Sequence, residues 1–204
     1  MSLQPTSRST PAEPERIETR AIDNLRFIRE TMERASAFTA VPGWGGAAMG
    51  LTALGAAALA ARFESRGVWL AIWLVEAWFA FTLGAAAMVW KAHRAHVPLL
   101  HGAGRRFMLA LCPPLVAGAL VTFVLYRMGA TAVLPGLWLL LYGAGVVTGG
   151  AFSVRIVPAM GIVLMAIGAA ALFAPASWGD GFMAVGFGLV QVVFGWIIAR
   201  RHGG

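Results

Sequence analysis

Six long apolar stretches alternate with short polar segments from about residue 44 to the end of the chain. Each has about the 20 residues that an α-helix needs to cross the roughly 30 Å hydrocarbon core of a bilayer. We therefore predict an all-α integral membrane protein with a six-transmembrane-helix bundle, occupying residues 42–200 and followed by a cytoplasmic tail at 201–204. The predicted spans are 44–61, 67–90, 107–126, 136–154, 156–173 and 182–199.

The segment before the first span has a different pattern. Residues 1–13 are rich in Ser, Thr and Pro and predict a disordered tail, whereas residues 14–41 predict a cytoplasmic amphipathic helix. Acidic and basic residues balance over 14–40, while a helix made for an anionic membrane surface carries excess Lys or Arg. Two interpretations stay open: packing on its own bundle or at the interface, or contact with a cytoplasmic protein or a second copy. The apolar face consists of Ile17, Ala21, Leu25, Ile28, Met32 and Ala35.

Composition supports the membrane interpretation, and charge orients it. Apolar residues make up 59% of the chain, more than the roughly 45–50% of soluble domains. Of the 16 Lys and Arg residues, all but Arg62, Arg66 and Arg127 fall in alternate gaps, beginning with the segment before the first span. The positive-inside rule therefore predicts cytoplasmic N- and C-termini in the inner (plasma) membrane. Because the basic residues flank spans, the net charge of +7 indicates anionic lipid headgroups and not nucleic acid.

Small residues and prolines indicate how the spans pack. Gly46 and Gly50 have the small-xxx-small spacing that lets a neighbouring helix approach closely. Pro113 and Pro114 remove two backbone donors and predict a kink in the third span. The segments 48–59 and 159–172 match apart from two inserted residues, so spans 1–2 and 5–6 are either a parallel repeat or similar by chance.

Glu76 is the one ionisable residue deep within a predicted span. A charge at that depth is unfavourable by on the order of 3 kcal/mol, so Glu76 should face inward and be protonated or paired. Counting residues from the outer ends places Gln191 and Thr52 at a similar depth, which predicts a polar cluster of Thr52, Glu76 and Gln191. The cluster is either a proton-coupled or cation-binding site, or a protonated carboxyl that donates an interhelical hydrogen bond.

Basic residues also gather between the second and third spans, on the predicted cytoplasmic side, and we call this set the basic surface. It consists of Lys91, His93, Arg94, His96, His101, Arg105 and Arg106. Three-residue spacing places His93 and His96 near each other, but no carboxylate or thiolate completes a metal site and the cationic neighbours oppose one. No metal is therefore expected, and haem ligation across the bundle is not expected either, because all four histidines lie outside the spans.

The remaining side chains form no catalytic set, so we expect no enzyme activity and no cofactor. Most tryptophans lie near span ends, where aromatic belts occur. These considerations favour an interaction, regulatory or structural membrane component that contacts membrane lipids and uses residues 14–40 for a partner. The alternative is a transporter for a small or lipophilic solute, with Glu76 as the coupling residue. The tryptophans assigned to span ends are Trp44, Trp69, Trp90, Trp138, Trp178 and Trp196.

Overall fold

The computed structural model describes residues 22–28, 32, 41–96, 99 and 102–202, which belong to two compact units divided after Ser36. In the first unit residues 22–28 are helical. The predicted tail at 1–13 and most of the predicted helix at 14–41 lie outside the described residues.

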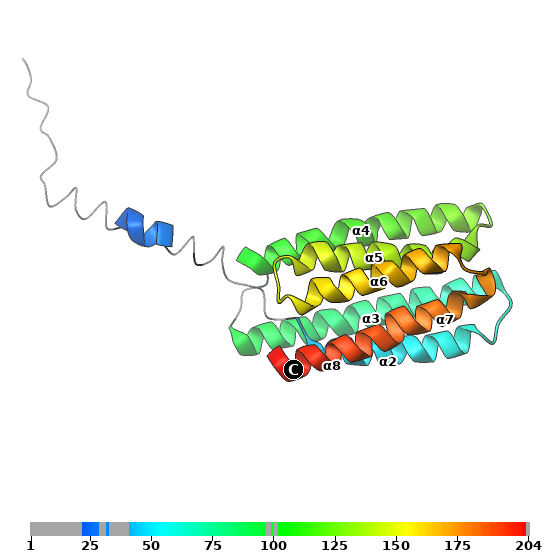
Figure 1. The fold of residues 1–204 in the computed structure, drawn as a ribbon, viewed down its shortest axis with the longest axis horizontal. Coiled ribbons are helices and arrows are strands. Elements are labelled where there is room, and N and C mark those ends of the chain that lie inside the picture. Colours follow the sequence, from blue (N-terminus) through cyan, green and yellow to red (C-terminus); the bar gives the residue numbers. More distant parts are fainter. Residues whose placement is uncertain (1–21, 29–31, 33–40, 97–98, 100–101, 203–204) are drawn as a thin grey trace, which may run out of the picture. The chain divides into compact units, whose positions relative to one another are not determined.

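The described part of the second unit is helical and contains no strand, which confirms the all-α prediction for these residues. Six of its helical segments are long and apolar enough to cross a membrane. The long helical segments run in alternating directions along one axis, with α4, α5 and α6 on one side and α2, α7 and α8 on the other (Figure 1). The long helices are α2 (Gly43–Ala60), α3 (Arg66–Ala95), α4 (Gly102–Arg127), α5 (Leu134–Gly150) and α6 (Ile156–Phe173), followed by α7 (Gly179–Met183), the π-helix η3 (Ala184–Val190) and α8 (Gln191–His202) as one run. Two 3-10 turns, η1 (Thr131–Val133) and η2 (Ala176–Trp178), precede α5 and α7.

Two helices extend well beyond their predicted spans. The second predicted span stops at 90, but α3 continues through the basic surface to Ala95 and is capped by His96 in the left-handed conformation. The third predicted span starts at 107, but α4 begins at Gly102. Hydropathy marks the apolar length of a helix, and charged residues continue its backbone hydrogen bonding past that length.

Close glycine contacts join α2 with the η3–α8 run and α5 with α6. A Cβ added to Gly50 would lie 2.6 Å from the carbonyl oxygen of Gly188, and one added to Gly161 would lie 2.7 Å from that of Gly143. Gly46 is less restricted, since its added Cβ would lie 3.6 Å from the nearest atom. The similar segments 48–59 and 159–172 therefore lie in helices with different close partners.

The remaining two long helices are less enclosed. Helix α3 packs mainly on α2 and α4 packs mainly on α5, and no comparable contact joins α3 to α4 among the described residues. Both carry large apolar side chains that are more than half exposed, among them Trp78 on α3 and Phe123 on α4. The most deeply buried side chains come from the other helices: Leu134, Leu139, Leu164, Met183 and Val157.

Candidate functional site

A cavity of about 550 Å³ lies where α3 and α4 are not packed on each other. Its walls are apolar, with Trp78 and Phe81 on the α3 side and Val116 and Ala119 on the α4 side. These wall residues are exposed, and Trp78 and Val116 retain 71% and 59% of their accessible surface. The cavity therefore opens sideways, between the exposed faces of the two helices.

The floor of the cavity is buried and more polar. It includes Trp73 and Met183, which are 3% and 1% exposed, and the buried Thr122 and Gln191. Glu76 also lines the cavity from α3. The site thus combines apolar, exposed walls with a buried floor that carries hydrogen-bonding groups.

Thr52 of α2 lies against the Glu76 carboxyl. Its Oγ1 is 2.7 Å from Oε1 of Glu76 and 2.8 Å from the backbone carbonyl oxygen of Met49. A hydroxyl has one proton to donate, and the carbonyl can only accept. Both contacts are full hydrogen bonds only when the Glu76 carboxyl carries a proton and donates it to Thr52.

Gln191 pairs with a residue that the sequence reasoning did not single out. Its Nε2 donates to the hydroxyl of Tyr142 on α5 at 2.7 Å, and both side chains line the cavity. No hydrogen bond joins Gln191 to Glu76 within the described ranges. Of the predicted three-residue cluster, the structure joins Thr52 to Glu76 directly and places Gln191 on the same cavity with a different partner.

The π-helix determines which residues of the last helical run face the cavity. Residues eight apart in a regular α-helix lie about 80° apart around the axis, because each residue advances the helix by 100°. The i→i+5 hydrogen bonds of η3 accommodate an additional residue, which brings such positions back to one face. Met183, Phe187 and Gln191 accordingly all line the cavity.

At one end of the bundle, the carboxylate of Asp180 accepts hydrogen bonds from two of the tryptophans. The indole Nε1 atoms of Trp69 and Trp73 lie 2.7 and 3.4 Å from Oδ1 of Asp180. Trp69 also stacks on Trp138, with ring centroids 5.7 Å apart. Trp69 and Trp138, which we predicted as interfacial residues, thus belong to one aromatic cluster, and Trp73 and Trp138 line the cavity.

Helix α4 continues without a break through Pro113 and Pro114. Pro114 has no N–H, so the carbonyl of Ala110 loses its usual helical partner. Thr148 of α5 lies close to that carbonyl, with Oγ1 3.1 Å from its oxygen. The same hydroxyl lies 2.9 Å from the carbonyl oxygen of Ala144 and 3.1 Å from that of Gly145 in its own helix, so its one proton is shared among three acceptors. Pro114 itself lines the cavity.

The basic surface is separate from the cavity. Lys91 is only 8% exposed, and its Nζ donates to the carbonyl of Val41 at 3.0 Å. The side chains of His93, Arg94, His96, Arg105 and Arg106 are exposed, and His101 lies outside the described residues. Where the structure describes the chain, no group of three His, Cys, Asp or Glu residues is placed to hold a metal ion.

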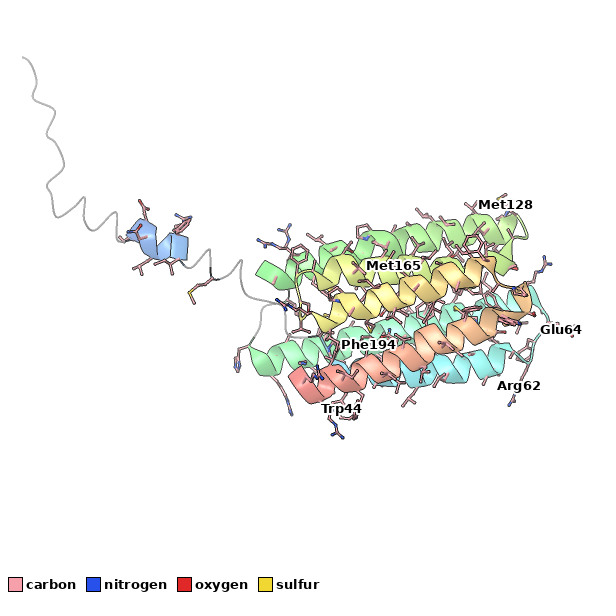
Figure 2. All side chains as sticks on the ribbon, in the orientation of Figure 1. Trp44, Arg62, Glu64, Met128, Met165 and Phe194 are labelled. Atoms are coloured by element: carbon pink, nitrogen blue, oxygen red, sulfur yellow. The ribbon has the colours of Figure 1, made fainter. Side chains whose placement is uncertain are left out.

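The two ends of the bundle differ in charge. Arg62 and Glu64 lie at the end opposite to Trp44 (Figure 2). Helix connectivity places the basic surface, Arg155 and Arg200 at the Trp44 end, because successive helices alternate in direction. The basic residues from alternate gaps in the sequence therefore lie at the same end of the bundle.

No protein-family model matches the sequence, no curated protein matches it, and no solved structure matches the fold. Function is therefore inferred from the geometry and chemistry of the cavity.

Proposed function

We propose that this chain is a multi-pass membrane protein that binds a lipophilic molecule in the cavity between α3 and α4. Helices α2 and α6 have 18 residues each and are about 27 Å long, close to the thickness of a bilayer core. The exposed apolar faces of α3 and α4 would contact lipid tails.

The cavity itself is the observation that carries the proposal. Its volume of about 550 Å³ is within the roughly 300–1,000 Å³ of small-molecule sites, and such sites combine apolar walls with a few polar groups. Since the walls open sideways and are apolar, the bound molecule would enter from the hydrocarbon region. Lipid tails are as apolar as these walls, so burial of methylene groups alone gives little preference over the bilayer. Selectivity would come from cavity shape and from Glu76, Gln191 and Tyr142.

The orientation and the N-terminal segment complete the proposal. The charged end with the basic surface would face the cytoplasm, in the inner (plasma) membrane, with both termini on that side. Residues 14–40 would contact a cytoplasmic protein or a second copy, and this part stays a prediction because most of these residues lie outside the described ranges. A transporter would use the same cavity with Glu76 as its coupling residue.

Photolabelling tests whether the cavity binds a lipophile. Purified protein in nanodiscs of zwitterionic lipid is irradiated with a long-chain alcohol that carries a diazirine, with and without excess dodecanol. We expect saturable labelling of α3 and α4 peptides, reduced about tenfold or more in Ala119→Phe, whose ring would fill the cavity.

Ala117→Phe is the matched control, because Ala117 is exposed on the same helix and does not line the cavity. It should label like the wild type. Labelling that dodecanol does not compete, or that is equal in all three proteins, would show that the cavity is not a binding site.

A further inference from the structure

Two acceptor atoms on the cavity are not engaged by the protein. Glu76 makes its hydrogen bond through Oε1, and Gln191 makes its hydrogen bond through Nε2. Within the described residues, Oε2 of Glu76 and the amide oxygen of Gln191 have no hydrogen-bond partner, and no fully enclosed side-chain oxygen or nitrogen lacks one. Since both residues line the cavity, these two oxygens can accept hydrogen bonds from a ligand.

The one acidic side chain on the cavity has no positively charged partner in the described lining. Its described lining contains one acidic residue, Glu76 of α3, and no Lys, Arg or His. The polar side chains that line the cavity from other elements include Thr122 of α4, Tyr142 of α5 and Gln191 of α8, and Thr52 of α2 contacts the Glu76 carboxyl. Of these only Tyr142 titrates, and as a phenol it supplies no positive charge. The Glu76 carboxyl group therefore has to be either protonated and neutral, or ionised with a cation from outside the protein beside it.

The ligand that satisfies both conditions has an apolar body and a cationic N–H donor. The apolar walls accept an alkyl or aryl body, a carboxylate compensates the positive charge, and the two unengaged oxygens accept N–H hydrogen bonds. A fatty alcohol would satisfy one oxygen and leave the carboxyl protonated. A fatty acid would bring a second carboxyl group next to Glu76.

We infer that the lipophilic ligand is an organic ammonium ion, a primary or secondary amine with an apolar body, and that Glu76 binds it in exchange for a proton. This inference rests on the proposed function. On binding, the O–H bond of the Glu76 carboxyl breaks and the proton leaves to water. The carboxylate then accepts hydrogen bonds from the ammonium group. One proton leaves for each cation bound, so the net charge of the site does not change.

Competition with the photolabel tests the exchange. Dodecylamine and dodecanol have the same chain and differ in head group, and each is added to the labelled nanodiscs over a range of pH, with empty nanodiscs as background. Dodecylamine should displace the label at concentrations at least tenfold lower than dodecanol. The ratio of the dodecanol concentration to the dodecylamine concentration that displaces the label should increase about tenfold per pH unit while Glu76 is protonated, since one proton is released per cation. A pH dye in weak buffer should record that release.

Three variants distinguish charge from structure. In Glu76→Gln the amine should lose its advantage and its proton release, while dodecanol should compete as in the wild type. Glu76→Asp keeps the acid and should retain proton release. Glu64→Gln removes an exposed carboxylate outside the cavity and should behave as the wild type.

The possible failures are distinguishable. If dodecanol displaces the label but dodecylamine is no better, or keeps its advantage in Glu76→Gln, the ammonium inference is wrong and the cavity still binds lipophiles. If neither compound displaces the label from wild type, the proposed function fails and this inference fails with it.

Discussion

The contact between α2 and α8 gives the most direct test of the fold that surrounds the cavity. A methyl group added at Gly50 would lie 2.6 Å from the carbonyl oxygen of Gly188 and 2.8 Å from the backbone nitrogen of Val192. Both are backbone atoms, so no side-chain rotation relieves the overlap. The helices would have to separate by roughly 0.8 Å to restore ordinary van der Waals contact.

Gly50→Ala should therefore destabilise the protein by about 1–3 kcal/mol, the usual range for overpacking. For a chain of this size, each kcal/mol corresponds to a fall in melting temperature of about 2–4 °C. Thermal unfolding of purified protein, followed by circular dichroism in detergent, measures the shift. Gly50 lies two residues before Thr52, so photolabelling of the cavity should also decrease.

Gly55→Ala is the matched control on the same helix. An added Cβ at Gly55 meets no atom within 4 Å. The substitution should leave stability unchanged or raise it slightly, because Ala favours helix more than Gly does. Equal melting temperatures for the Gly50 and Gly55 variants would refute the close α2–α8 contact.

Two further predictions concern the ends of the bundle. Asp180→Ala should lower stability by about 1–3 kcal/mol, because two indole N–H groups lose their acceptor, while Asp180→Asn keeps an acceptor oxygen and should lower stability less. Unfolding in dodecyl sulfate, followed by tryptophan emission, measures both changes, and equal losses would contradict the role of that oxygen. In a Cys112→Ala background, an impermeant maleimide added to intact cells should modify a cysteine placed at Glu64 and should reach one placed at Arg155 only after permeabilisation; the reverse pattern would overturn the proposed orientation.

The depth of polar residues could be predicted from sequence, but their pairing could not. Residue counting placed Thr52, Glu76 and Gln191 at a similar level because helix rise is constant. Tyr142 lies six residues after the start of the predicted span at 136 but eight residues after the start of α5, so the structure places it deeper than sequence counting did. Which residues bond depends on helix rotation, and the π-helix before Gln191 changes that rotation in a way that hydropathy does not reveal.

The cavity could not be predicted because it depends on which helices fail to touch. The apolar pattern of α3 and α4 is the same whether their faces contact lipid, a neighbouring helix or a bound molecule. Asp180 is a partial exception. It follows Trp178 and Gly179 two residues before the predicted span 182–199, and an acidic residue there could have been matched to Trp69 across the bundle. The pairing of Trp69 with Trp138 carries no comparable signal.

Close packing elsewhere explains how an open cavity can persist. Between helices in a bilayer the hydrophobic effect supplies little attraction, so cohesion comes from van der Waals contact and hydrogen bonds. The glycine contacts at Gly50 and Gly161 concentrate that cohesion in the α2–α8 and α5–α6 pairs. Helices α3 and α4 each pack mainly on one neighbour, α2 and α5, and need no contact with each other. Lipid or ligand can then occupy the space between them, and Glu76 is the residue that would favour one occupant over the other.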